Sequence, residues 1–392
     1  KWEQAEAAWK ESLNIRKELV GEEHPDYVRA QLGLAGLYHA QSKLEDAEAL
    51  YEIVIKNYQK QVKVFFPSMS EKEKAAFFAK VKNAFDSYSD FAFEYSATNS
   101  VKRPELLKKV YDLQLINKAI LLSSSSNIRA KILGTKDTQI LSLYQEWLRT
   151  KELILKWYTQ YSIEERDQMD IKQLENRAND LEKSLSLQSS FFKEGMDEEL
   201  ITWSEVKKSL STGEAAVEIL RIKKKFEKDT IYYVGLLVNS QSEFPEAVIF
   251  PFGNKLESRY YKFLRNSIKF FHKDSISYPV FWKPLEEKLN NVKTVFISCD
   301  GVFNKVNFNV LREKNSDQFV IDKWLVRRLS NTRELVEIRK ATESVTVSNS
   351  ALLIGFADFN LEATNISLSD TKRSAAHFFG FEGDEIPVLP AT

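Results

Sequence analysis

GEAAVEILRI, Gly213 to Ile222, marks the point at which the sequence changes from a helical to a strand pattern. Its apolar part, Ala215–Ile222, is predicted to form a strand. Two further strands are expected at residues 231–238 and 247–252. The linker between them, residues 239–245, has a length typical of a hairpin, so these two strands are expected to pair as neighbours.

Helices alternate with strands in the rest of this half of the chain. Ala351–Phe356 is a continuous apolar run, which is typical of a strand buried on both faces of a parallel sheet. Such alternation predicts an α/β sheet flanked by helices. The other elements expected here are helices at residues 203–210, 256–271, 278–289 and 332–339 and strands at residues 294–298 and 320–329.

The N-terminal part contains an internal repeat. Ala5, Trp9 and Leu13 recur 42 residues later as Ala47, Tyr51 and Ile55, and a helix stop and restart lies between the two sets at residues 21–27. Small residues allow helices to approach closely, and aromatic residues fill the space beside them. The pattern predicts helix–turn–helix repeats, and the alternative is an ordinary helical hairpin.

Residues 57–191 are helical by pattern, with breaks at Pro67 and Pro104. Ser70 and Glu73 have the spacing of a capping box at a helix start. Aromatic residues follow at helical spacing, and core packing is the favoured explanation for them over a ligand groove.

The composition excludes several classes of function. The 56 Lys and Arg residues equal the 56 Asp and Glu residues, which argues against a dedicated nucleic-acid-binding protein. No apolar run has membrane-spanning length, so no membrane contact is expected. Cys299 is the only cysteine and the four histidines are scattered, so neither a disulfide nor a metal or organic cofactor site is predicted. A reducing, cytoplasmic location fits these features.

Several stretches together resemble known families. Residues 1–60, with "EHPDY" in the turn, resemble tetratricopeptide repeats (TPR). The longer remainder resembles the CHAT family, caspase-like domains fused to TPR arrays in bacteria. The stretches that carry this resemblance are "KAILLSSS" (118–125), "YQEWLRTKELI" (144–154), "TWSEVKKSLSTGEAAVEILRI" (202–222), "FWKPLEEKL" (281–289), "VFISCDGVFNKVNFNVL" (295–311), "RLSNTREL" (328–335), "ALLIGFADFN" (351–360) and the final "LPAT".

The resemblance implies three segments: the end of a TPR array at 1–60, a helical connector at 61–200, and the N-terminal portion of a caspase-like CHAT domain at 201–392. In that family a catalytic His and Cys end two later core strands, so the dyad is expected beyond Thr392. Cys299 stands where the family commonly has Pro and does not match the nucleophile. This chain alone is therefore expected to be inactive.

Two carboxylates are candidates for lining a substrate pocket. Asp300 lies in the turn after the strand 294–298, where it is expected to cap the turn beside Gly301 or, less favoured, to shape the substrate cleft. The resemblance implies that the segment after the strand 351–356 helps line the pocket for the residue before the cut, and the carboxylate of Asp358 there would favour Lys or Arg in a substrate. A loop residue making turn hydrogen bonds is the alternative for Asp358.

The resemblance implies that the parent protein is a cytoplasmic cysteine endopeptidase. Its TPR region would sense a protein partner, and the peptidase would then cut a protein or peptide substrate, in bacterial defence or cell death. The alternative is a non-catalytic scaffold that only binds proteins.

Overall fold

The computed structural model describes residues 1–66, 69–118, 132, 137–159, 170–188, 201–314 and 318–344. The predicted strand at 351–356, the candidate Asp358 and the final "LPAT" lie outside these residues.

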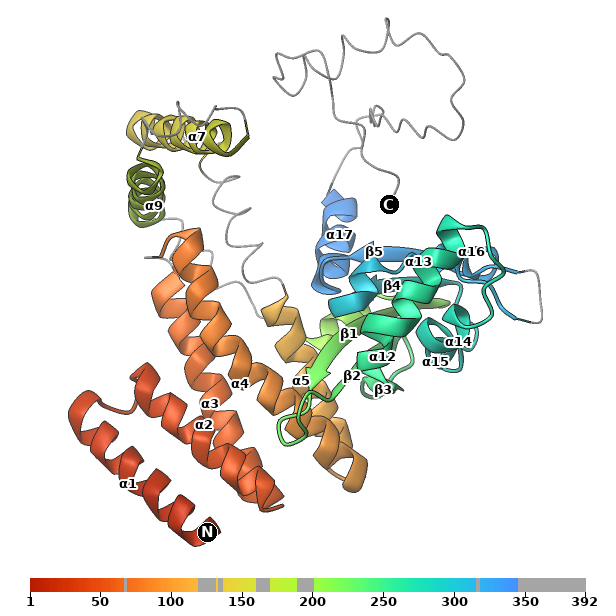
Figure 1. The fold of residues 1–392 in the computed structure, drawn as a ribbon, viewed down its shortest axis with the longest axis horizontal. Helices are drawn as coiled ribbons and strands as arrows, with labels where there is room; N and C mark the ends of the chain where they lie inside the picture. Colours follow the sequence, from red (N-terminus) through yellow and green to blue (C-terminus); the bar gives the residue numbers. More distant parts are fainter. Residues whose placement is uncertain are drawn as a thin grey trace, which may run out of the picture.

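Three helices form the N-terminal end of the molecule (Figure 1): α1 (Trp2–Val20), α2 (Pro25–Ala40) and α3 (Leu44–Phe65). The chain ends α1 at Gly21 with φ +84° and restarts at Pro25, whose fixed φ suits a first helical position. Ala35, Ala47 and Tyr51 are fully buried between the helices. The predicted repeat of paired helices, with small residues at close approaches, is confirmed.

Two further helices lead from these to the sheet, α4 (Glu71–Thr98) and α5 (Arg103–Asn117). The predicted capping box is present, since the Glu73 amide donates to Ser70 Oγ and the Ser70 amide donates to Glu73 Oε2. Pro104 lies in the first turn of α5, as expected. Helices α7 (Thr138–Thr159) and α9 (Ile171–Gln188) pack on each other beyond the far end of α4 (Figure 1).

Among the described residues, the second half holds a five-stranded mixed sheet in the order β3-β2-β1-β4-β5. Strands β1 and β2 and strands β2 and β3 pair antiparallel, whereas β4 pairs parallel with both β1 and β5. The predicted hairpin is thus confirmed, and so is the fold class of a helical region followed by a sheet flanked by helices. The strands are β1 (Glu214–Lys223), β2 (Ile231–Asn239), β3 (Glu246–Phe250), β4 (Thr294–Ser298) and β5 (Leu325–Leu329).

Helices cover both faces of this sheet. One face packs against α4, α5 and two short helices, α11 (Trp203–Lys208) and α17 (Arg333–Ser344). The other face packs against the segments between the strands. These are α12 (Gly253–Lys255), the π-helix η2 (Leu256–Tyr260), α13 (Tyr261–Lys269), α14 (Ser277–Phe281), α15 (Lys283–Glu286), the 3₁₀ helices η3 (Gly301–Lys305) and η4 (Phe308–Val310), and α16 (Val320–Lys323).

Three sequence predictions need correction. The strand expected at 320–329 begins only at Leu325, because Asp322 accepts the Phe319 amide and starts a helical turn, α16. The third strand ends at Phe250, because Pro251 cannot donate a ladder bond and Phe252 has φ +66°. The helix expected at 278–289 is two short helices that divide at Trp282, just before Pro284.

We call the face that packs against α4, α5, α11 and α17 the helix face. The core on this face is continuous with the N-terminal helices. One cluster of buried side chains runs from Val28 in α2 through Phe91 in α4 and Tyr111 in α5 to Leu220 in β1. The relative placement of the helices and the sheet is therefore fixed by packing along this side.

Candidate functional site

The parallel strands β1, β4 and β5 direct their carboxyl ends to one edge of the sheet, where ligands are commonly bound in open α/β folds. The turn after β4, Cys299–Asp300–Gly301, lies at this edge. Polar networks hold it from both faces of the sheet, and we treat this edge as the candidate site.

Asp300 is engaged by backbone amides on both carboxylate oxygens. Its Oδ1 accepts the Gly301 amide at 2.7 Å and its Oδ2 accepts the Arg221 amide of β1 at 3.0 Å. It thereby caps η3 and joins the turn to β1. A role in shaping a substrate cleft stays a prediction.

Position 301 requires a glycine for two reasons, the backbone conformation and the close approach of neighbouring side chains. Its φ is +53°, and a Cβ placed there would lie 2.1 Å from the hydroxyl oxygen of Tyr233. That hydroxyl accepts the Val302 amide at 2.9 Å and donates to Glu257 Oε1 at 2.6 Å. The turn therefore wraps tightly around the Tyr233 side chain.

Glu257, from the π-helix η2, also accepts two bonds from the Arg221 guanidinium, at 2.5 and 3.1 Å. Its pKa is lowered, first because Arg221 donates to it and then because Tyr233 does, although partial burial opposes the shift. Burial raises the pKa of Tyr233, and the Glu257 bond adds to that effect. The carboxylate is therefore charged and the phenol neutral at neutral pH.

The opposite face of the same edge holds a buried ion pair. Glu218 in the middle of β1 has no exposed side-chain surface, and its Oε2 lies 2.8 Å from Lys118 Nζ at the end of α5. The Lys118 ammonium also donates to the Ile219 carbonyl at 2.7 Å and to Ser298 Oγ at 3.0 Å. Burying charges is tolerated because each has several partners.

The turn between β5 and α17 completes this network. Glu218 Oε1 accepts the Thr332 amide at 2.6 Å and its hydroxyl at 2.7 Å, while Tyr111 on α5 hydrogen-bonds the same hydroxyl at 2.9 Å. Asn331 donates to the Gln114 and Leu115 carbonyls at the end of α5. Helix α5 is thus bonded to β1, β4 and the end of β5 through one set of polar groups.

This network escaped the sequence analysis, although one signal was present. A glutamate in the middle of an otherwise apolar strand requires a buried partner. The partner could not be named, since Lys118 lies 100 residues earlier in the chain.

Cys299 lies between the two networks with its sulfur 3.4 Å from Arg328 Nη2. Burial raises the pKa of this thiol, and the Arg328 guanidinium opposes the shift without cancelling it. None of the hydrogen bonds or ring contacts of the histidines in the described ranges involves Cys299. Its surroundings favour the neutral thiol, which is a poor nucleophile.

At the other end of the molecule, α1 packs on α2 through one aromatic ring. A Cβ placed on Gly33 would lie 2.4 Å from the Trp9 ring, so the missing side chain provides the space that the indole fills. This is the aromatic-on-small contact that the repeat predicted.

Residues 1–60 match the tetratricopeptide repeat family. No curated protein matches the chain. A search of the helices in the described ranges found none with the length and apolarity needed to cross a bilayer.

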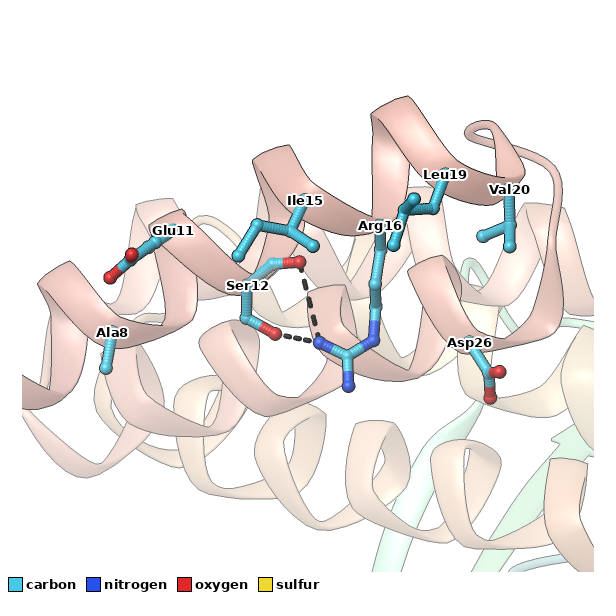
Figure 2. A pocket seen from close by; sticks show the side chains of 8 residues that line it. All are labelled: Ala8, Glu11, Ser12, Ile15, Arg16, Leu19, Val20 and Asp26. Atoms are coloured by element: carbon cyan, nitrogen blue, oxygen red, sulfur yellow. Dashed lines mark hydrogen bonds between the residues drawn. The ribbon is translucent and has the colours of Figure 1, made fainter.

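The TPR region carries an open groove of about 500 Å³ on its outermost helix (Figure 2). Seven lining residues come from α1 and one, Asp26, from α2. Ile15 and Leu19 are exposed there, while Arg16 is turned back to Ser12 by hydrogen bonds. Apolar and polar side chains contribute about equally to its lining.

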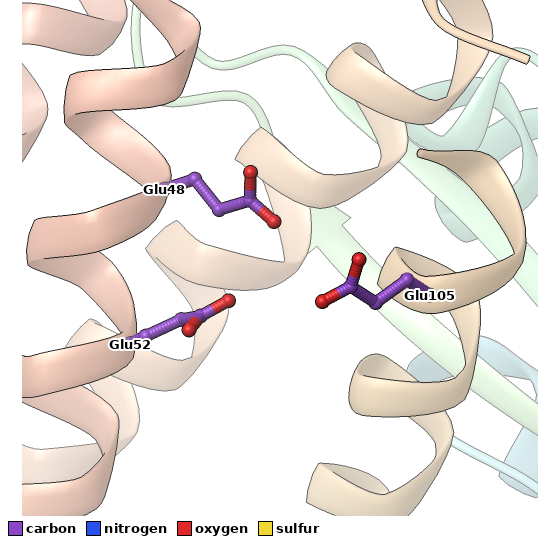
Figure 3. Close-up of side chains that lie close together, drawn as sticks. All are labelled: Glu48, Glu52 and Glu105. Carbon is purple, nitrogen blue, oxygen red and sulfur yellow. The ribbon is translucent and has the colours of Figure 1, made fainter. Parts of the chain in front are cut away.

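Three carboxylates meet where the TPR region contacts α5: Glu48 and Glu52 on α3 and Glu105 on α5 (Figure 3). Two lysines lie among them. Lys102 is 3.0 Å from Glu48, and Lys109 is 2.6 Å from Glu105 and also bonds Glu52. The ammonium groups already neutralise most of this charge, so the cluster is better described as an ion-pair network between helices than as a cation site.

Proposed function

We propose that this chain is the recognition and coupling part of a TPR-regulated, caspase-like cysteine endopeptidase. In this proposal residues 1–60 recognise a protein partner, residues 61–200 connect, and the sheet from residue 201 onwards belongs to the peptidase domain. The match to tetratricopeptide repeats supports the recognition role, because repeat arrays present surfaces for proteins and peptides.

The observation that carries the proposal is the Lys118–Glu218 network. It bonds α5, which packs within the same core as the TPR helices, to the carboxyl edge of the three parallel strands. A shift of the TPR region on partner binding would therefore change bonds at that edge directly. Such a connection is what a partner-sensing peptidase needs, because its active groups must be aligned only after recognition.

The chemistry in this proposal comes from residues expected after Thr392, a histidine acting as base and a cysteine as nucleophile. Asp300 would fix the shape of the cleft beside them. Asp358 would select Lys or Arg before the scissile bond. The resemblance further supports a protein substrate in bacterial defence or cell death.

Protein cleavage by the polypeptide that contains this chain, together with any sequence that follows Thr392, tests the proposal. We expect partner-dependent cleavage that survives Cys299→Ala and is lost when a later cysteine is replaced. The double variant Lys118→Met/Glu218→Gln, which removes both buried charges, should keep basal cleavage of a short peptide while reducing stimulation by the partner. Loss of cleavage in Cys299→Ala, or no cleavage with the partner bound, would contradict the proposal.

A non-catalytic scaffold is the second candidate. The match of residues 1–60 to tetratricopeptide repeats favours it, because repeat arrays can act by binding proteins alone. Partner binding measured by calorimetry, without cleavage of any bound protein, would support the scaffold.

A further inference from the structure

The loop between β1 and β2 reaches across the molecule to the TPR region. We call its residues 225–229 the tip. The Lys225 amide donates to Asp90 Oδ2 of α4 at 2.9 Å, and the Tyr232 hydroxyl of β2 donates to Asp90 Oδ1 at 3.1 Å. Asp90 is buried, so a single carboxylate of α4 holds both the tip and the strand that follows it.

The Lys225 backbone contacts α4, and its side chain extends to α2 and α3. Its ammonium group donates to the Tyr51 hydroxyl at 3.2 Å and lies 5.5 Å from the centre of that ring. A Cβ placed on Gly36 of α2 would lie 2.4 Å from this ammonium nitrogen. The absence of a side chain at Gly36 therefore provides the room that Lys225 occupies.

Phe226 makes the second contact of the tip. Its ring lies edge-on to the imidazole of His39 with centroids 5.0 Å apart. His39 in turn packs edge-on against Phe91 and hydrogen-bonds Glu94 at 3.1 Å, while its Nδ1 has no hydrogen-bond partner among the described residues. Phe226 remains 51% exposed, so the tip rests on this surface without sealing it.

The surface under the tip comprises Gly36 and His39 of α2, Tyr51 of α3, and Asp90 and Glu94 of α4; we call it the tip groove. It offers the Tyr51 hydroxyl and ring for a cation and the His39 imidazole for an aromatic ring, while Asp90 accepts from the backbone of the docked segment. These features match a lysine followed by an aromatic residue, which is what Lys225 and Phe226 supply.

We propose that the tip is an internal ligand of the TPR region, and that a protein partner carrying a basic residue followed by an aromatic one competes with it for the tip groove. The inference rests on the proposed role of the TPR region in protein recognition. Displacement of the tip would release the loop between β1 and β2 from α4, and β1 carries both Glu218 and Arg221 at the candidate site. Partner binding and tip docking then exclude each other.

A direct test places the tip sequence on a separate peptide. The probe is a fluorescein-labelled peptide of residues 223–229, Lys-Lys-Lys-Phe-Glu-Lys-Asp. The receptor is the 392-residue chain with residues 225–229 replaced by Asn-Gly. The Lys224 amide bonds the Thr230 carbonyl at 2.9 Å, so a two-residue turn can close the hairpin at this pair.

We expect fluorescence anisotropy to show that the peptide binds this variant at least about tenfold more tightly than it binds the wild-type chain, whose groove is already occupied. Gly36→Leu added to the variant should abolish binding by filling the lysine position. A control peptide with serine at the positions of Lys225 and Phe226 should not bind. Equal affinity for both chains, binding to neither, or insensitivity to Gly36→Leu would overturn the proposal.

A second receptor variant controls for misfolding caused by the shortened loop. Lys225→Ser/Phe226→Ser keeps the loop length and should bind the same peptide, whereas Lys228→Ala, which alters an exposed tip residue, should behave as wild type. These measurements need neither cleavage nor the natural partner. If the protein has no peptidase activity, the peptide should still bind as described. If the peptide does not bind, the tip proposal fails, whereas partner-dependent cleavage is unaffected.

Discussion

Glu218 and Arg221 lie three residues apart in β1 and face opposite sides of the sheet, where each forms an ion pair with the layer that covers it. The Glu218 and Lys118 side chains are 0% and 14% exposed, while those of Arg221 and Glu257 are 35% and 28% exposed. The first pair depends wholly on its protein partners, whereas water can replace part of the second. The helix face of the sheet should therefore tolerate the loss of an ion-pair partner less well than the opposite face.

The largest expected effect comes from breaking the buried pair. Glu218→Ala leaves the Lys118 ammonium and the Thr332 amide without their acceptor, and should lower the free energy of unfolding by about 3–5 kcal/mol. Urea denaturation followed by circular dichroism measures this. The double variant Lys118→Met/Glu218→Gln removes both charges but keeps an acceptor for Thr332, so it should recover much of the loss. A double variant as unstable as Glu218→Ala would show that charge pairing is not the cause.

Gly301→Ala tests the other face, where the turn wraps around Tyr233. We expect a loss of about 2–3 kcal/mol, because alanine is strained at φ +53° and its Cβ would collide with the Tyr233 hydroxyl. Gly213→Ala is the control, since Gly213 also has a positive φ, +83°, and the nearest atom to the added Cβ is the Asn291 carbonyl oxygen at an ordinary contact distance of 3.7 Å. The control should lose only about 1 kcal/mol. Equal losses in the two variants would remove the steric part of the explanation.

The two faces should also differ in their response to pH. On the helix face, Asp112 of α5 accepts the Trp203 amide of α11 at 2.6 Å, and burial raises its pKa to about 6. The folded state then holds a proton that the unfolded state has lost, so stability falls as pH rises from about 4 to 7. Asp112→Asn should remove this fall and add about 1–2 kcal/mol near neutral pH, after allowance for solvent screening. Thermal melts of the wild type and Asp112→Asn across this pH range measure the effect. Parallel pH profiles of stability for the two proteins would contradict the prediction.

Glu257 on the opposite face should respond with the opposite sign and the smallest size. Its pKa is lowered by Arg221 and Tyr233, so its contribution is present above its ordinary value of 4.5 and is lost as pH falls through the folded value. Glu257→Gln should cost less than about 1 kcal/mol at neutral pH, because water screens the pair. The cost should vanish in melts at low pH. A cost that grew on acidification would mean that the carboxylate is not the stabilising form.

Local patterns predicted the fold well where a few neighbouring residues decide the outcome. The strand 294–298 and the capping box at Ser70 depend on adjacent side chains, and both were predicted correctly. The helix divides at Trp282 next to Pro284, and α16 starts where the Asp322 carboxylate accepts the Phe319 amide. Hydrophobic periodicity captures neither feature. The candidate site depends on a pair distant in sequence, Lys118 with Glu218, and the tip groove on another, Lys225 with Tyr51. One sequence alone cannot specify such pairs.

The position of β5 at the edge of the sheet determines where a further strand could pair. Within the described part of the chain β5 pairs only with β4, so its outer edge keeps unpaired backbone donors and acceptors. A strand added there in the same direction as β5 would bring its last residues next to Ser330 and the Cys299 turn, whereas one added in the reverse direction would bring its first residues there. The polarity of the next strand thus decides which end of that strand can contribute chemistry beside the buried network.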